Sequence, residues 1–322
     1  MTASEWDTLK KVLKEYNLDS NVFTASELPS FANRVWYVKL AYESVIVKEY
    51  FTFTRETLQQ LDILFRVLNN VQIPVPSLYI NKQGGYLTVL EGKYYHVFKY
   101  IDHRPLTYTK LNITDSDLEK AGRQLARIHL LNATDVGIMR LDFEVLNMEI
   151  TNLVNGFTTR YKKDAHFSED KLVREKIDFL FEYLQQTKKI RAKILDDSRY
   201  FSFQNEPSVF THGDYSLTNL LPDDKTKTLY VIDWDEMQWR PRMFELQRSV
   251  GLLCGKGVCN ANLDEINERK ATIFLQAYSS IYPLTLKHAV QLSEVAEYTS
   301  LIYWLQFSLS QTLIGDFRIL EI

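Results

Sequence analysis

The chain has 322 residues, a formal net charge of −3, and charged residues of both signs that make up 25% of the sequence. Because no basic cluster accompanies this balance, composition argues against nucleic acid as the main partner. No apolar run is long enough to span a bilayer and no signal-like segment follows Met1, so we expect a cytoplasmic protein without membrane contact. The two cysteines, Cys254 and Cys259, form neither a C-x-x-C pair nor a disulfide framework.

The first hundred residues predict an antiparallel sheet. Alternating apolar and polar residues at 30–40 predict a strand, and residues 44–50, with an apolar run that leads into Lys48, predict a second. A glycine-containing turn predicts a hairpin over residues 78–90, and a further strand is expected at 94–102. Lys48 ends the apolar run of the second strand, and by itself it would be an ordinary strand lysine.

Helical periodicity separates and follows these strands. Residues 54–69 carry apolar side chains at 58, 61, 64, 65 and 68, which predicts an amphipathic helix. After a linker at 102–105, a capping sequence precedes a second helix over 118–131. Residues 170–196 predict a charged amphipathic helix, and residues 293–313 predict a packed core segment. The second part of the chain is therefore expected to be largely helical.

The most informative stretch lies between residues 211 and 235. Two short apolar runs flank a polar turn, residues 222–227, and so predict a hairpin. If the hairpin folds at the middle of this turn, Asn219 lies nearly opposite Val231, and Asp233 follows just past the end of the pairing. Asn219 and Asp233 then emerge at the same end, and Asp214 lies in the loop above them. The sequence thus predicts a site with two carboxylates and one amide.

These residue types suit phosphoryl transfer. Mg²⁺ prefers carboxylate and amide oxygen, so Asn219 and Asp233 are candidate metal ligands. A hydroxyl that attacks a phosphoryl group needs a carboxylate to orient it and accept its proton, a role that suits Asp214. Asp and Asn also cap turns, and any one of the three alone would favour that interpretation. The full pattern, with the hairpin leading into Asp233, favours the catalytic one.

The segment from His212 to Asn219 has the pattern H-G-D-x-x-x-x-N, and it resembles the catalytic loop of the aminoglycoside phosphotransferase and choline kinase-like family. The Tyr-rich stretch near residues 79–101 further resembles spore-coat kinase-like members of the same family. Asp233 and Trp234 resemble the D-W or D-F that replaces the D-F-G of protein kinases. The resemblance implies a bilobal α+β protein-kinase-like fold. An N-terminal ATP-binding lobe, residues 1–103, would hold an antiparallel sheet and helix C. A larger, mainly helical lobe, residues 104–322, would hold the catalytic and substrate-binding residues.

The same resemblance implies an ATP site in the first lobe. Lys48 would contact the α- and β-phosphates, and the acid that pairs with it would be Glu56, although the family spacing falls nearer Gln60. The nucleotide-covering loop contains no glycine, so Ser30 and Asn33 would donate side-chain hydrogen bonds instead. Adenine would meet the backbone around three residues near the hinge: Phe98, Tyr100 and Ile101.

Other residues qualify this picture. Glu245 stands where the family has an Asp that braces the catalytic loop, and His129 resembles a histidine that is buried for structural reasons. The segment with Trp234 and Trp239 could form an acidic, aromatic wall for a cationic acceptor, or it could simply pack. Gly213, where protein kinases carry Arg, favours the small-molecule branch.

We therefore expect an ATP- and Mg²⁺-dependent phosphotransferase, a small-molecule kinase that acts on an alcohol group. Aminoglycoside, choline-like amine, amino-acid and sugar acceptors all fit the pattern, as do ATP and GTP as donors. The alternative is a catalytically weak or inactive kinase-fold binding or spore-coat protein, which the glycine-free loop would favour. A protein kinase is the third class, disfavoured because little room for an activation loop follows Asp233.

Overall fold

The computed structural model describes residues 2–18, 22–30, 33–51, 53–107, 112–132, 208–255, 266–285 and 288. The predicted segments at 170–196 and 293–313, and Cys259, lie outside these residues. The chain divides into two compact units. Unit 1 contains Met1–Thr107 and Thr218–Trp234, and the described part of unit 2 lies within Tyr108–Leu131, Met139–Leu217 and Asp235–Ile322. Unit 1 thus includes a segment of the second predicted lobe.

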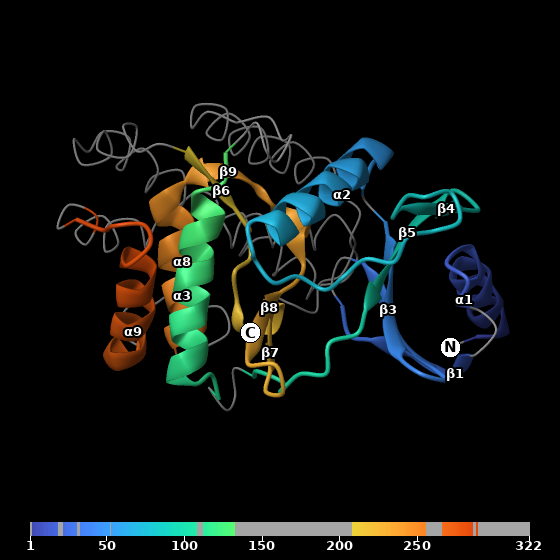
Figure 1. Cartoon of the computed structure of the whole chain (residues 1–322), viewed down its shortest axis with the longest axis horizontal. Coiled ribbons are helices and arrows are strands. Elements are labelled where there is room, and N and C mark those ends of the chain that lie inside the picture. Colours follow the sequence, from blue (N-terminus) through green and yellow to red (C-terminus); the bar gives the residue numbers. More distant parts are fainter. Residues whose placement is uncertain are drawn as a thin grey trace, which may run out of the picture. The chain divides into compact units, whose positions relative to one another are not determined.

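Unit 1 is built on a five-stranded antiparallel sheet with the order β1-β2-β3-β5-β4 (Figure 1). Its strands are β1 (Val22–Leu28), β2 (Arg34–Leu40), β3 (Ser44–Tyr50), β4 (Thr88–Leu90) and β5 (Lys93–Lys99). The predicted antiparallel sheet is confirmed, and it includes β1, which was not predicted. The strand expected from residue 30 begins at Arg34, and the first half of the predicted hairpin contributes only a bridge between Leu78 and Phe98.

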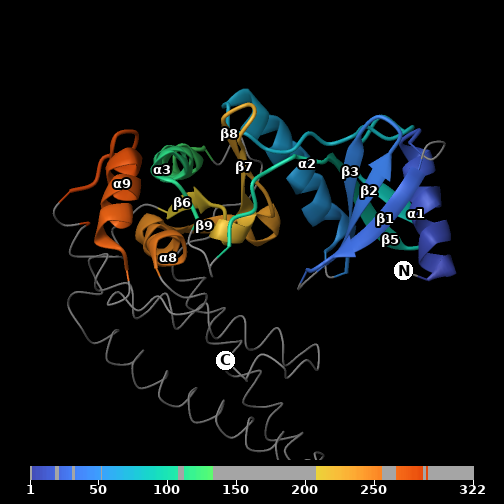
Figure 2. The same cartoon turned by 90° about the horizontal axis from the view of Figure 1, so that it is seen from below.

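Alternation along the strands gives this sheet two different faces. One face is apolar and packs on α1 (Ala3–Glu15), which the sequence analysis did not predict. Its buried core consists of Leu9, Val12 and Leu13 from α1 and Tyr16 directly after it, with Trp36, Val38, Leu40, Val45, Val47, Tyr95 and Val97 from the sheet. Figure 2 shows α1 and α2 (Arg55–Asn70) on opposite sides of the sheet. The second face therefore belongs to α2.

Helix α2 confirms the helix predicted over 54–69. Thr54 caps it by accepting a hydrogen bond from the backbone N–H of Thr57. The five apolar positions of the predicted stripe are all buried: Leu58, Leu61, Leu64, Phe65 and Leu68. Phe65 packs on Phe98 of β5, with ring centroids 5.7 Å apart. Because even-numbered residues of β5 face α2, His96 lies on this side as well.

Unit 1 also contains the hairpin of β7 (Leu220–Asp223) and β8 (Thr228–Val231). Leu220, not Asn219, pairs with Val231, because the turn takes four residues, 224–227, where the prediction folded the chain one position earlier. The backbone N–H of Ile232 nevertheless donates to the carbonyl of Asn219 at 3.0 Å. The prediction that Asn219 and Asp233 emerge at one end of the hairpin is thus confirmed.

The described part of unit 2 combines helices with a two-stranded sheet. The helices are α3 (Asp115–His129), α8 (Arg242–Cys254) and α9 (Glu268–Ser279), and the strands are β6 (Ser208–Thr211) and β9 (Gln238–Pro241). Helices α3 and α9 run side by side in both views (Figures 1 and 2). Gly122 permits this approach, since a Cβ there would lie 2.3 Å from the carbonyl oxygen of Phe274. The predicted capping box at Thr114 and Asp117 is present.

In the described ranges, the helices lack the length and apolar character required to cross a membrane.

Candidate active site

Lys48 lies on the α2-facing side of β3, where strand alternation also places Ile46 and Tyr50. Its side chain is buried, and its Nζ donates to Oδ1 of Asp233 at 2.7 Å, although the two residues are 185 positions apart in the chain. The same ammonium lies 5.1 Å from the centroid of the Tyr50 ring, within the range of a cation–π contact. The sheet and the hairpin of unit 1 thus meet at this ion pair.

Asp233 owes its position to the end of β8. Its φ of +64° is in the left-handed region, which Asp adopts more readily than most side chains because its short polar group bonds locally. The next residue, Trp234, is buried, and its Nε1 donates to the carbonyl of Val231 at 3.3 Å. The side chain of Asp233 keeps 48% of its surface exposed. One carboxylate oxygen therefore binds Lys48, although nearly half of the side-chain surface of Asp233 is exposed.

Asn219 is the buried last residue of a 3-10 turn, η2 (Leu217–Asn219). Its backbone bond to Ile232 holds it beside the segment that carries Asp233. An amide oxygen and a carboxylate at one end of a hairpin are hard donors of the kind that Mg²⁺ takes, together with phosphate oxygens. The donor set therefore fits a magnesium ion that is bound along with a nucleotide. Within the described residues, no group of three or more His, Cys, Asp or Glu forms a metal site of another type.

In unit 2, Asp214 follows β6 in the loop predicted to be catalytic. Its backbone N–H donates to Nδ1 of His212 at 3.2 Å. Its Oδ1 accepts from Nη2 of Arg248 at 2.7 Å, and both side chains are part-buried. The sequence analysis did not single out Arg248. The available signal was its helical spacing, because position 248 shares a helix face with 245, three residues earlier.

Glu245 of α8 braces the predicted catalytic loop. Its carboxylate is buried and accepts from the backbone N–H groups of Gly213 at 2.6 Å and His212 at 3.1 Å. Nε2 of His129 adds a third contact at 2.8 Å, and Nδ1 of the same ring is 2.8 Å from the hydroxyl of Tyr278. Burial raises the pKa of Glu245, but its hydrogen bond to His129, the charges of His129 and His212 and the Gly213 N–H outweigh burial and leave that pKa below its usual value. The buried, structural role expected for His129 is confirmed.

Gly213 has a geometric reason to be glycine. Its φ is +91°, and a Cβ at this position would lie 2.0 Å from the carbonyl oxygen of Glu236. Any side chain here would force the backbone of residue 236 to move, because two non-bonded heavy atoms cannot approach each other so closely. The glycine of the H-G-D motif thus lets the loop pass against Glu236, the last residue of η3 (Trp234–Glu236).

The structure does not bring Glu56 to Lys48. Glu56 lies exposed in the first turn of α2, where a hydrogen bond to its own backbone N–H and then the hydroxyl of Thr54 lower its pKa. A different acid of the same helix, Asp62, points toward the sheet and approaches His96 at 3.0 Å. The sequence analysis missed Asp62. An acidic residue beside the apolar stripe of a helix was the signal that could have found it.

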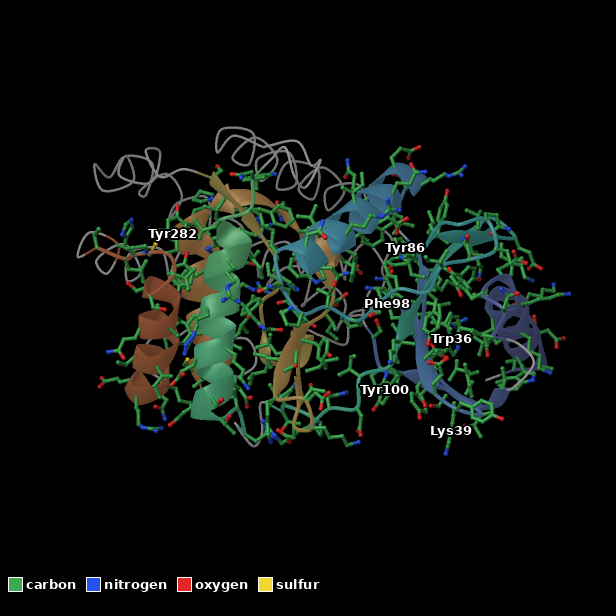
Figure 3. All side chains as sticks on the ribbon, viewed as in Figure 1. Trp36, Lys39, Tyr86, Phe98, Tyr100 and Tyr282 are labelled. Carbon is green, nitrogen blue, oxygen red and sulfur yellow. The ribbon has the colours of Figure 1, made fainter. Side chains whose placement is uncertain are left out.

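The remaining predicted nucleotide residues occupy two places. Ser30 is exposed and Asn33 is buried, at the two sides of the glycine-free loop. Phe98 lies on β5 and Tyr100 just after it (Figure 3). The backbone N–H of Tyr100 donates to the carbonyl of Ser44 at 3.1 Å, so this donor already serves the sheet.

The segment with Trp234 and Trp239 had two interpretations, an acidic, aromatic wall and simple packing. Trp234 and Trp239 are both buried, and Trp239 packs edge-on against Phe210. The packing interpretation therefore fits these tryptophans better than a surface for cations. The carbonyl of Ile101 lies 2.8 Å from Nδ1 of His103.

The arrangement can be compared with known proteins. Residues 24–284 match the family model for the phosphotransferase enzyme family, APH. The chain belongs to this family. The family suggested by the H-G-D motif is thus confirmed, and membership places the chain among small-molecule phosphotransferases. A search of curated proteins gives no significant match.

Solved structures of several small-molecule kinases have a similar fold. Spectinomycin phosphotransferase APH(9)-Ia, in complex with ADP and spectinomycin, has a TM-score of 0.64 and 18% identity, over 98% of this chain and 93% of that chain. The ethanolamine kinase of Plasmodium vivax has a TM-score of 0.64 and 13% identity, over 98% and 84%. Choline kinase LicA from Streptococcus pneumoniae has a TM-score of 0.57 and 16% identity, over 97% and 92%. The predicted α+β protein-kinase-like fold is confirmed.

Proposed function

We propose that this member of the phosphotransferase enzyme family transfers the γ-phosphate of ATP to a hydroxyl of a small molecule. The observation that carries the proposal is the 2.7 Å contact of Lys48 Nζ with Asp233 Oδ1, at the hairpin end that also holds Asn219. A buried ammonium supplies a cation for phosphates, and the two other side chains supply oxygen donors for Mg²⁺. The crystallisation of spectinomycin phosphotransferase with ADP and with AMP supports a nucleotide as donor.

In this proposal each residue has one task. Lys48 binds the α- and β-phosphates through its ammonium group. Asn219 and Asp233 would hold Mg²⁺, which when bound would neutralise charge on the β- and γ-phosphates. Asp214 orients the acceptor hydroxyl and takes its proton. As the hydroxyl oxygen bonds to the γ-phosphorus, the bond from that phosphorus to the β–γ bridging oxygen breaks and ADP leaves. Positioning and charge neutralisation supply most of the rate.

Arg248 and Glu245 prepare this chemistry from within unit 2. The 2.7 Å bond from Arg248 restricts the rotation of the Asp214 carboxylate, so the acceptor meets a base whose direction is already set. Glu245 fixes the loop backbone on the N-terminal side of Asp214 through the N–H groups of residues 212 and 213. The base is therefore held at its side chain and at its main chain.

A panel of hydroxyl compounds tests the proposal. ADP release would be measured with ATP and Mg²⁺ on aminoglycosides, choline-like amines, amino acids and sugars, each as a separate acceptor. Asp214→Ala should remove acceptor-dependent turnover and leave the Kd for ADP within about twofold, because the base does not bind the nucleotide. Acceptor-dependent turnover that persists in Asp214→Ala would remove the base assignment.

One observation favours a second candidate, a kinase-fold binding or spore-coat protein with little or no turnover. The loop that should cover the nucleotide has no glycine over residues 28–33, and Ser30 within it is exposed. Thermal unfolding with Mg²⁺ and ATP separates the two candidates. A nucleotide at a hundred times its Kd stabilises its binding protein by about 2.7 kcal/mol, whereas a protein without a nucleotide site gains nothing.

A further inference from the structure

A chain of polar side chains crosses the α2-facing side of the sheet in unit 1. It begins at Asp62 of α2, whose Oδ1 is 3.0 Å from Nε2 of His96. Nδ1 of the same ring is 3.1 Å from the hydroxyl of Tyr50, and the Tyr50 ring centroid is 5.1 Å from Lys48 Nζ. We name these four residues the Asp62–Lys48 chain. It ends at the ion pair of Lys48 with Asp233.

Strand register accounts for this juxtaposition. Lys48 and His96 are directly paired residues of β3 and β5, so their side chains leave the same face of the sheet. Tyr50, two residues after Lys48, emerges on that face as well. Helix α2 covers the face with its apolar stripe, and Asp62 is carried toward the sheet one position after the buried Leu61. An acid of the helix therefore meets the histidine that stands beside the lysine.

The chain orients each of its members. The carboxylate of Asp62 faces Nε2 at ion-pair distance, with an angle that departs from that of a hydrogen bond, and so favours the proton on that nitrogen. Nδ1 then accepts a hydrogen bond from the hydroxyl of Tyr50. The Tyr50 ring also packs edge-on against His96 and Phe53, at centroid distances of 5.4 Å in both cases. Held in this way, the ring presents its face to the ammonium of Lys48.

The members of this chain are buried, and burial makes their positions depend on one another. His96 is 1% exposed and Lys48 is 9% exposed. Burying polar groups is costly unless they are paired, so each member depends on its neighbour for compensation. A change at Asp62 should therefore reach Lys48 through His96 and Tyr50, although Asp62 does not contact the lysine in any described interaction.

We propose that Asp62, His96 and Tyr50 are positioning residues for Lys48, and that they set how tightly the protein holds nucleotide phosphates. This inference rests on the proposed function, because it takes Lys48 as the phosphate-binding lysine. The acid of α2 acts on the lysine indirectly, through an imidazole and a phenol, instead of through a direct ion pair. A change in the Asp62–Lys48 chain should therefore alter the affinity for ligands that carry phosphates, and leave the affinity for the nucleoside unaltered.

The test compares two probes, ADP with Mg²⁺ and adenosine, by isothermal titration. Asp62→Asn, His96→Gln and Tyr50→Phe should each raise the Kd for ADP by about five- to tenfold, a size typical of residues coupled in one network. The Kd for adenosine should change by less than about twofold, since adenosine has no phosphate for Lys48 to hold. Tyr95→Phe is the matched control. Tyr95 precedes His96 in β5, and its side chain is buried on the opposite face of the sheet, which packs on α1. This variant should leave both values unchanged.

A double variant tests the order of the chain. If Asp62 acts through His96, Asp62→Asn should have little further effect on ADP binding once His96→Gln is present. Effects that multiply would show two independent contributions and overturn the inference. So would equal weakening of ADP and adenosine, which indicates a general loss of structure. If Asp62→Asn does not unfold cooperatively, Tyr50→Phe still tests the inference, because it removes a single hydroxyl.

The proposed function and this inference fail in different ways. If the unaltered protein binds neither ADP nor adenosine, the nucleotide site itself is wrong, and both proposals fall. If the unaltered protein binds ADP and all three variants bind it equally well, the proposed function stands and the positioning role is overturned.

Discussion

Replacing Glu245 with glutamine exchanges one oxygen of a buried carboxylate for an NH₂ group at nearly constant volume. The carboxylate accepts from three donors, the N–H groups of Gly213 and His212 and Nε2 of His129, at 2.6 to 3.1 Å. The amide oxygen of glutamine can keep the donors at one end, and the NH₂ then opposes a donor at the other. A hydrogen bond to a charged group contributes about 1.5–3 kcal/mol, and an unsatisfied buried donor costs about 1–3 kcal/mol. We therefore expect Glu245→Gln to lower the free energy of unfolding by about 3–5 kcal/mol, the range for removing one member of a buried ion pair.

The stability difference between the unaltered protein and Glu245→Gln should depend on pH. The folded-state pKa of Glu245 is lowered although burial opposes this, because the hydrogen bond and charge of His129, the charge of His212 and the Gly213 N–H prevail. A lowered pKa means that the ionised carboxylate stabilises the fold above the ordinary glutamate pKa of 4.5. This contribution is lost as pH falls from about 5 through the folded-state pKa. The advantage of the unaltered protein over Glu245→Gln should therefore shrink on acidification.

The assay is urea unfolding at a series of pH values between about 4 and 7, followed by tryptophan fluorescence. Glu119→Gln is the matched control, because Glu119 is half-exposed and its ion pair with Arg123 spans one helical turn at the surface. That variant should change stability by no more than about 0.5 kcal/mol. A Glu245→Gln protein within about 1 kcal/mol of the unaltered one, or a difference that grows on acidification, would refute the bracing role.

Three further predictions concern the loop and the ion pairs. Gly213→Ala should lower the melting temperature and abolish turnover, as measured by circular dichroism and ADP release, because a Cβ would lie 2.0 Å from the Glu236 carbonyl oxygen; unchanged melting would contradict the tight approach. Arg248→Ala should lower kcat by about tenfold or more with little effect on the Kd for ADP. Arg248→Lys should restore part of kcat, since a lysine can still donate one hydrogen bond to Asp214. An unchanged kcat in Arg248→Ala would exclude the positioning role. Asp233→Asn should retain the fold, because Asn also adopts positive φ. The variant loses the carboxylate charge, so titration with and without Mg²⁺ should show that ADP binding no longer depends on Mg²⁺. Retained dependence would remove Asp233 as a ligand.

Sequence patterns predicted the parts of this fold that depend on local periodicity. The apolar stripe of α2 is buried at each of the five positions expected. Lys48 lies in the second predicted strand, and the hairpin end holds Asn219 beside the strand that leads to Asp233. These features follow from the periods of helix and strand, which a sequence displays directly.

Features that depend on tertiary packing were missed. Helix α1 has only three fully buried positions, so its pattern is weak until a sheet lies beneath it. Glu56 was the acid chosen from the sequence, but its place in the first turn of α2 carries it to the surface, while Asp62 faces the sheet. The pairing of Arg248 with Asp214 joins a helix to a loop 34 residues earlier, which no short-range pattern encodes. The hairpin register shifted by one residue because the turn has four residues, and turn length is weakly specified by a polar run.

The most direct test of the phosphotransferase site is a crystal structure with Mg²⁺ and a non-hydrolysable ATP analogue. We predict Mg²⁺ at about 2.1 Å from the side-chain oxygens of Asn219 and Asp233, with Lys48 Nζ in hydrogen-bond contact with the phosphates. Phosphates bound elsewhere, or a metal ion held without Asp233, would contradict this prediction.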